Sequence, residues 1–419
     1  MTRLIHTCLA LLVLAAPARA VEISLSCGVI GGQYNVCQDS VDRWERRTGH
    51  TVRIVPTPQA SNDQLVFFRE RLARPESGEV IDVVKIDTIW VNFVEQYLVD
   101  LSAYSEGAET QHFAALVENA SFEGELKALP LWSDVGLFFY RKDLLEKHGT
   151  AVPRTWDEME TVARQIQAAE RAEGNRIWGY IFDGDAGEGL TCNAMEWLAT
   201  MGGAQILDAE GRVAVDDPAA MDTLRRVKGW IGDIAPPEVT TLNNESAREM
   251  FQDGGAVFMR NWPYVWALAQ EDWSKVKGKV GVTTLPGGAA GSGAGTSGGW
   301  YLGVSQDSAH PEIAADLVLH MTSKNEQLQR ALFSSVNPTR PELYSNPDIR
   351  NMSDFFGEIF AALQTAINRP NAELRGSYTF VSDRWSETVN AYLSGEAEDP
   401  STLFAPLQEQ LARLERRGW

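Results

Sequence analysis

The first hundred residues alternate between short apolar runs and amphipathic stretches, and this alternation constrains the fold more than any other feature. Residues 21–26, 51–56 and 80–86 have the composition of buried strands. Residues 39–48, after a Gly-rich turn, and residues 62–74 have the apolar spacing of helices. A near-continuous apolar run such as 80–86 is expected where helices cover both faces of a sheet. The pattern therefore predicts an open α/β sheet with a ligand at the carboxyl ends of its strands.

A second α/β region follows. Residues 135–140 are predicted as a buried strand, with Pro130 closing the segment before it, and residues 141–148 as a short helix. Thr155-Trp-Asp-Glu158 and Ser246-Ala-Arg-Glu249 have the capping-box spacing that predicts helix starts. A chain of 419 residues is long enough for two lobes with separate cores.

The first twenty residues have the pattern of a cleavable secretory signal. Arg3 precedes an apolar run too short to span a bilayer, and Ala18-Arg-Ala20 suits a cleavage site. We therefore predict an exported, soluble periplasmic protein with Val21 as its mature N-terminus. Because no cysteine stands at position 21, we do not expect a lipid anchor.

Charge and cysteine content narrow the possible partners. The net charge is −20, and removal of Arg3 and Arg19 with the signal leaves −22, which argues against nucleic acid or anionic membranes as partners.

Cys27 and Cys37 could form a disulfide in an oxidising compartment, a pairing that the sequence leaves open, and Cys192 is expected to be a buried thiol. The six histidines are scattered without metal-ligand spacing, so we expect neither a metal nor a cofactor.

Aromatic and polar residues recur together after predicted strands. The pairs are Asp87 with Trp90, Trp132 with Asp134, Trp262 after Arg260-Asn261, and Trp300 after Gly298-Gly299. A lone tryptophan is more often a core residue, and a lone aspartate often caps a helix. Four such pairs at strand ends instead favour a polyhydroxylated ligand, whose rings have apolar faces and hydroxyl rims. The same carboxylates could serve a glycoside hydrolase, which uses two of them.

Other chemistries have less support. The segment 291–296 is glycine-rich but lacks the Lys-Ser/Thr of a phosphate loop, so a mobile connection between lobes is the simpler interpretation. Neither a Gly-x-Ser-x-Gly elbow nor a Ser or Cys placed beside a His is present for nucleophilic catalysis.

Five segments closely resemble the periplasmic sugar-binding proteins of ABC importers, in their trehalose/maltose-binding branch. They are residues 128–149, 188–192, 250–266, 276–281 and 298–305. The similarity extends over nearly the whole chain that follows the signal. It implies the two-lobe periplasmic-binding-protein fold of type II, with crossing hinge segments and a ligand cleft between the lobes. We expect an N-terminal lobe of residues 21–132 plus about 296–345 and a C-terminal lobe of about 133–295 plus about 346–419.

The resemblance also implies the residues of the cleft. These would be Asp87, Trp132, Asp134, Glu188, Trp262, Gly299, Trp300 and Arg369. Trp262 and Trp300 would stack on sugar faces, Asp87 and Asp134 would accept hydrogen bonds from hydroxyls, and Arg369 would donate to sugar oxygens.

Three departures from the family pattern affect which sugar we expect the protein to bind. Gln33 stands near the start of the mature chain where relatives bind with an acid, and Gln64 replaces an expected arginine. Trp132 replaces a tyrosine platform. Loss of a charged pair could adapt the pocket to another glucoside than trehalose.

The sequence therefore predicts a non-catalytic, monomeric receptor that captures a small α-glucoside and passes it to an inner-membrane permease. A secreted glycoside hydrolase is the alternative from another class. A sensing protein that reports to a membrane receptor is a third hypothesis and shares the same fold.

Overall fold

The structure is a computed structural model, which describes residues 20–27, 31–58, 61–73, 80–288 and 293–419. Its strands are β1 (Glu22–Ser26), β2 (Thr51–Val55), β3 (Val83–Asp87), β4 (Ser121–Phe122), β5 (Glu125–Leu126), β6 (Leu129–Val135), β7 (Leu137–Arg141), β8 (Trp178–Ile181), β9 (Ala256–Asn261), β10 (Val280–Thr283) and β11 (Ser297–Val304). Its α-helices are α1 (Gly31–Thr48), α2 (Ser61–Ala73), α3 (Val91–Val94), α4 (Ala114–Asn119), α5 (Lys142–Lys147), α6 (Trp156–Ala172), α7 (Glu188–Trp197), α8 (Pro218–Lys228), α9 (Asn244–Gln252), α10 (Val265–Ala269), α11 (Pro311–Met321), α12 (Lys324–Ser334), α13 (Pro347–Asn351), α14 (Ser353–Gln364), α15 (Asn371–Leu374), α16 (Tyr378–Leu393) and α17 (Ser401–Glu415).

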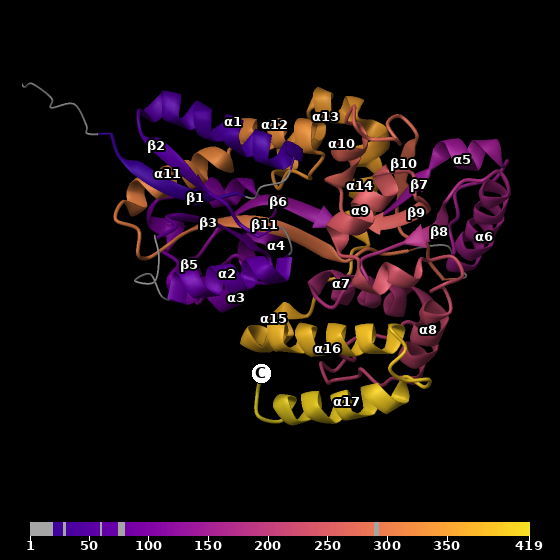
Figure 1. Cartoon of the computed structure of the whole chain (residues 1–419). Coiled ribbons are helices and arrows are strands. Elements are labelled where there is room, and N and C mark those ends of the chain that lie inside the picture. Colours follow the sequence, from indigo (N-terminus) through magenta and orange to yellow (C-terminus); the bar gives the residue numbers. More distant parts are fainter. Residues whose placement is uncertain (1–19, 28–30, 59–60, 74–79, 289–292) are drawn as a thin grey trace, which may run out of the picture.

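The first lobe is built on a five-stranded sheet in the order β2-β1-β3-β11-β6. Strands β1, β2 and β3 are parallel, and β11 runs antiparallel to both β3 and β6. Helices α1, α11 and α12 lie along one side of this sheet, and α2 and α3 lie along the other (Figure 1). Coverage of both sides explains why the side chains of β3 are buried throughout.

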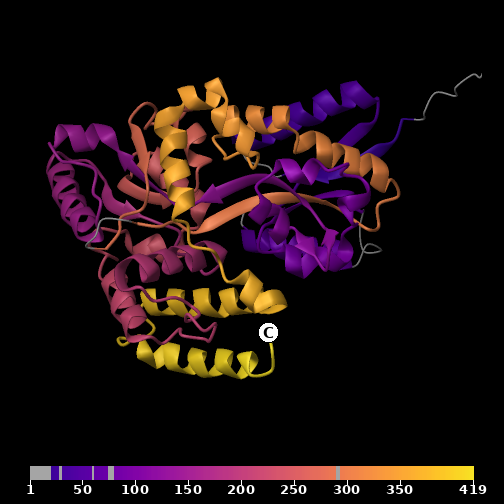
Figure 2. The same cartoon turned by 180° about the vertical axis from the view of Figure 1, so that it is seen from behind.

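The second lobe is built on a four-stranded sheet in the order β10-β7-β9-β8. Its core includes residues of β7, β9 and β10 packed with helices α9, α10 and α14. Helices α16 and α17 run side by side beneath this lobe in both views (Figures 1 and 2). The α/β class predicted from the sequence is confirmed.

Two neighbouring strands, β6 and β11, approach the second sheet from the first and pass through the middle of the molecule (Figure 1). Gly136 is the one residue between β6 and β7, which belong to different sheets. Its amide donates to the carbonyl of Thr296 at 3.0 Å. A Cβ on Gly136 would lie 2.2 Å from Glu196 Oε1, and one on Gly295 would lie 2.1 Å from the Gly136 carbonyl oxygen. The close approach at this crossing therefore requires glycine on both segments.

The lobes also contact one another beside the crossing. Helix α2 of the first lobe contacts α7 of the second, and α3 contacts the short helix η8 (Arg375–Ser377). The predicted lobe boundaries near residues 132 and 296 stay predictions.

Some predicted elements need correction. The predicted single strand 135–140 is divided between β6 and β7, because the chain changes sheets at Gly136. Pro130 does not end a segment but lies inside β6, an edge strand that tolerates proline, and its carbonyl accepts bonds from Gln327 and Thr339.

Helix starts were predicted with mixed success. The capping box at Thr155 is confirmed, since its hydroxyl accepts from the Glu158 amide and Glu158 bonds back to Thr155. The second box is wrong: α9 begins earlier, with Asn243 as its cap and Ser246 as the reciprocal partner. Helix α1 also begins eight residues before the predicted 39, at Gly31.

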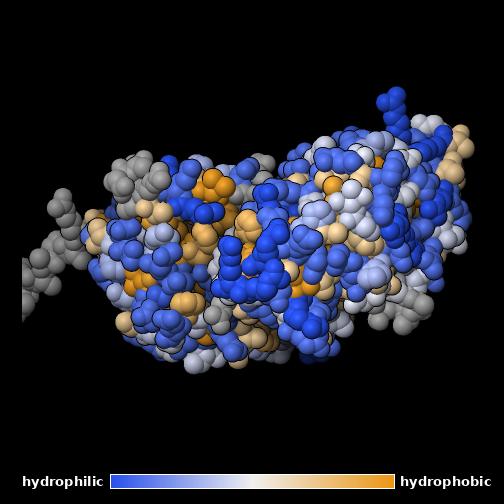
Figure 3. Space-filling view, turned by 90° about the horizontal axis from the view of Figure 1, so that it is seen from below, coloured by the Kyte–Doolittle hydropathy of each residue, from blue (hydrophilic) through white to orange (hydrophobic). Residues whose placement is uncertain are grey.

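Cys27 and Cys37 form a disulfide between β1 and α1, which decides the pairing that the sequence left open. Cys192 is a buried free thiol, as predicted. Seen from below, the surface is mainly hydrophilic with scattered hydrophobic residues (Figure 3). Over the described ranges, we find no helix long and apolar enough to cross a membrane.

Candidate functional site

The register of the first sheet brings four predicted site residues onto one face. Trp300 lies opposite Asp87 on β3 and opposite Trp132 on β6, and Gly298 lies opposite Asp134. Directly opposed residues, and residues two apart on a strand, share a face. Trp132 and Asp134 therefore lie on the same side of the sheet, and the ring centroids of Trp132 and Trp300 are 6.1 Å apart.

Gly299 is required between these residues for a backbone reason. Its φ is +144°, and a Cβ there would lie 2.6 Å from the Trp132 carbonyl oxygen. A larger side chain would separate β11 from β6. The predicted contribution of Gly299 to ligand binding stays a prediction, whereas its part in strand packing follows from this geometry.

Trp262 reaches this cluster from the second sheet. It follows β9, and a Cβ on Gly298 would lie 3.1 Å from its ring. The guanidinium of Arg260 lies 4.2 Å from the centroid of the same ring. Arg260 is held in turn by Glu196, and both side chains are about 1% exposed. The two sheets thus bring Trp262 close to β11.

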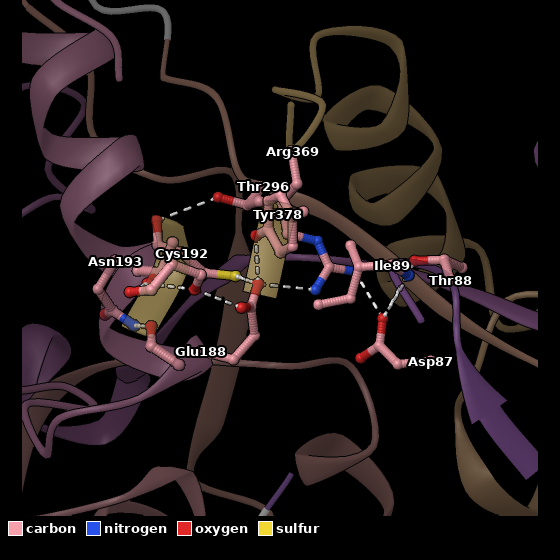
Figure 4. A network of polar contacts seen from close by, with 12 residues as sticks. Asp87, Thr88, Ile89, Glu188, Cys192, Asn193, Thr296, Arg369 and Tyr378 are labelled. Carbon is pink, nitrogen blue, oxygen red and sulfur yellow. Dashed lines mark hydrogen bonds and ion pairs between the residues drawn. The ribbon is translucent and has the colours of Figure 1, made fainter. Parts of the chain in front are cut away.

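Arg369 connects two predicted carboxylates from different lobes (Figure 4). Its Nη2 donates to Asp87 Oδ1 at 2.9 Å and to Thr88 Oγ1 at 2.8 Å, and its Nη1 donates to Glu188 Oε1 at 3.1 Å. Burial of the guanidinium opposes its charge, but the pKa of Arg369 is still raised because Asp87 and Glu188 stabilise the cation. The network is therefore a charge-balanced bridge.

Glu188 receives further donors from helix α16. Tyr378 and Ser382 each donate a hydroxyl to its carboxylate at 2.6 Å. Burial nevertheless raises the pKa of Glu188. Sequence reasoning missed Thr88, Tyr378 and Ser382. The spacing of four between Tyr378 and Ser382, which puts both on one helix face, was the available signal.

The carboxylate of Asp134 is distinguished by its hydrogen bonding and by its pKa. Its Oδ2 accepts from Trp132 Nε1 at 2.8 Å. Its Oδ1 is buried and has no hydrogen-bond partner within the described part of the chain. Burial raises the pKa of Asp134 to about 7. A buried acceptor of this kind can take a hydrogen bond from a ligand hydroxyl.

The structure gives less information on Gln33 and Gln64, the two glutamines that depart from the family pattern. Gln64 lies in the first turn of α2 with its side chain buried. Gln33 lies in the first turn of α1, but its side chain is outside the described residues. Their proposed effect on the choice of sugar stays a prediction.

A cavity of about 620 Å³ lies between the lobes beside Arg369, and among the described residues none of the tryptophans or carboxylates of the cluster lines it. Its wall includes Thr88 and Asn119 from the first lobe, Gln205 from the second, and Gly298 and Arg369. The volume is in the range of small-molecule pockets. Among the described residues, no group of three or more His, Cys, Asp or Glu side chains could hold a metal ion.

Two α/β lobes, joined by crossing strands and meeting at a buried cluster of tryptophans and carboxylates, define a two-lobe binding protein. Residues 33–328 match the family described as bacterial extracellular solute-binding protein. The chain belongs to this family, and the resemblance found in its sequence is confirmed.

Individual relatives agree with this family assignment. A probable ABC transporter-binding protein of Deinococcus radiodurans is 40% identical over 407 residues, which cover 97% of this chain and 96% of that protein. The structure of maltose-bound T. maritima MalE3 is 34% identical, with a TM-score of 0.87 over 94% of this chain and 100% of that chain. The GacH receptor of Streptomyces glaucescens, 22% identical with a TM-score of 0.82, covers 95% of this chain and 99% of that chain and shares the fold. The predicted two-lobe fold is thus confirmed.

Proposed function

We propose that this chain is the periplasmic substrate-binding component of an ABC importer and that it captures a disaccharide or small α-glucoside of the trehalose/maltose type. The observation that carries this proposal is the convergence of Trp132, Trp300 and Trp262 with Asp87 and Asp134 where the two lobes meet. Indole faces match the apolar faces of sugar rings, and carboxylates accept from the surrounding hydroxyls.

Two relatives support the two parts of the proposal, the sugar ligand and the ABC importer. The structure that is 34% identical holds maltose, and the relative that is 40% identical is named for an ABC transporter. Cleavage after residue 20 would release a periplasmic chain that begins at Val21. This chain would deliver its sugar as a monomer to the permease.

Sugar capture would proceed by closure of the lobes. Asp87 lies on the first lobe, Glu188 and Trp262 lie on the second, and Arg369 connects Asp87 with Glu188. A ligand that contacts residues of both lobes favours the closed form, which the permease would recognise. The ligand would be released unchanged.

A thermal-shift panel tests the proposal. The sugars are trehalose, maltose, sucrose, glucosylglycerol, glucose and an acidic sugar, each followed by analysis for cleavage products. A ligand at 100 times its dissociation constant adds about 2.7 kcal/mol of stability, which this assay detects. We expect a shift with one intact glucoside and no cleavage.

The glycoside hydrolase is the second candidate, because a carboxyl with a pKa of about 7, as at Asp134, suits a general acid. Release of glucose that is lost on Asp134→Asn or Glu188→Gln would establish it instead. If no sugar shifts the melting temperature, the proposed ligand class is wrong.

A further inference from the structure

Each tryptophan proposed to stack on sugar has a buried cation over its ring. The Arg260 guanidinium lies 4.2 Å from the centroid of Trp262. The Lys85 ammonium lies 4.0 Å from the centroid of Trp300 and 5.4 Å from that of Trp132. Lys85 is only 4% exposed, so its contacts with the rings are shielded from water. Cation–π attraction is stronger in such a desolvated place than at an exposed one.

The strand register explains how Lys85 reaches these rings. It lies two residues before Asp87 on β3, so both side chains leave the same face of the sheet. Trp300 lies opposite Asp87, and Trp132 lies opposite Trp300. The side chain of Lys85 thus lies on the face of the sheet that carries the predicted site.

The two cations differ in how they are held. Arg260 forms two hydrogen bonds with Glu196, its pKa is raised despite burial, and it is charged at any ordinary pH. For Lys85 the structure shows no carboxylate within ion-pair distance among the described residues. On this face its ammonium instead lies over the rings of Trp300 and Trp132.

We propose that Lys85 is a positioning residue of the sugar site: its ammonium occupies one face of the Trp300 ring, fixes the orientation of that ring and leaves the opposite face for sugar. The inference rests on the proposed function and adds to it a dependence of affinity on the charge of one lysine. Sequence reasoning missed Lys85 because a lysine inside an apolar strand has no motif.

The charged groups around Lys85 set the pH range of this dependence. Burial lowers the pKa of Lys85 to about 8; Asp87 on its own strand and Asp134 on β6 oppose this effect, and Arg330 on α12 adds to it. The ammonium is therefore present at pH 7.5 and largely lost by about pH 10. Its attraction to the rings disappears with the charge.

The test compares the wild-type chain with Lys85→Met, an apolar side chain of similar length, by isothermal titration with maltose at pH 7.5 and 10. Lys127→Met is the matched control, because Lys127 is also buried, at 8% exposed, but bonds to Leu98 and Glu125 away from the tryptophans. We expect Lys85→Met to weaken binding at least about tenfold at pH 7.5 and to approach the wild-type affinity by about pH 10. Lys127→Met should follow the wild type at both pH values.

A loss that is equal at both pH values would show only a packing effect and would overturn the proposal, as would no loss at all. A ligand-free titration of tryptophan fluorescence separates this inference from the proposed function. A transition near pH 8 in the wild type that is missing from Lys85→Met supports the cation on the ring even if maltose does not bind. Identical curves overturn it.

Discussion

Trp300 lies at the centre of the predicted aromatic cluster. It lies between Asp87 and Trp132 in the sheet, its ring meets Trp90 edge-on at 5.5 Å, and Lys85 lies over it. The sequence predicted Trp300, Trp132, Asp134 and Asp87 as site residues from their pairing along the chain, and the family resemblance added Arg369. Sequence reasoning could not find Lys85 or Thr88, because their neighbours come from distant strands and segments.

Trp300→Ala should reduce sugar affinity at least about tenfold, or about 1.4 kcal/mol, because it removes the stacking surface. Trp273→Ala is the control, since Trp273 is 60% exposed and lies outside the cluster. Isothermal titration measures both variants. Unchanged binding by Trp300→Ala would remove this residue from the site.

Lys85→Met should stabilise the ligand-free chain at pH 7 by up to about 3 kcal/mol, since the folded pKa of Lys85 is about 8 instead of 10.5. The unfolded chain binds more protons between pH 8 and 10.5, so wild-type stability rises with pH over this window. The advantage of the variant should therefore disappear by about pH 10.5. Urea unfolding at pH 7 and 10.5 measures this, and a variant less stable at pH 7 would contradict it.

Asp134→Asn tests the raised pKa of the Asp134 side chain. The folded pKa of about 7 exceeds the ordinary 3.8, so the folded wild type binds more protons between these values and loses stability as pH rises through them. The variant lacks this group, and its stability relative to the wild type should increase from pH 4 to pH 8. A difference that is independent of pH in urea unfolding would contradict the assignment.

At the scale of elements, the sequence predicted strands and helices well where local pattern decides and poorly where tertiary contacts decide. Strands β1 and β2 agree with their predicted runs to within one residue at each end. The apolar run across β6 and β7 is continuous in sequence, and only the crossing at Gly136 divides it. The hinge itself was predicted from family resemblance and not from any local signal.

Gly136→Ala should destabilise the fold by about 1–3 kcal/mol, because the added methyl would overlap Glu196 and Arg260, which are fixed by their ion pair. Gly149→Ala is a useful comparison: its φ is +64°, but a Cβ there meets no atom within 4 Å, so only backbone strain is added. Thermal unfolding compares them. A Gly136→Ala chain as stable as the wild type would show that the crossing is not tightly packed.

At the scale of the whole molecule, the bridge from Asp87 through Arg369 to Glu188 links the two lobes (Figure 4). The sequence suggested all three residues through the family resemblance, but as ligands of the sugar and not as partners of one another. That pairing depends on how two lobes and the segment before α15 come together, which no local pattern contains.

Arg369→Met should open the ligand-free molecule, because it leaves two buried carboxylates without their cation. Small-angle scattering should show a larger radius of gyration than for the wild type, and saturating sugar should reduce the difference. Arg384→Met, which removes a partly exposed arginine paired with Glu387, is the control. Equal radii without ligand would show that the bridge does not hold the lobes together.

The most direct test of sugar capture is isothermal titration of the wild-type chain with maltose and trehalose, followed by recovery of the sugar. We predict one sugar per chain for at least one of the two, recovered intact after prolonged incubation. Recovery of glucose, or absence of binding by both sugars, would contradict the assignment of this chain as a receptor for this class of glucosides.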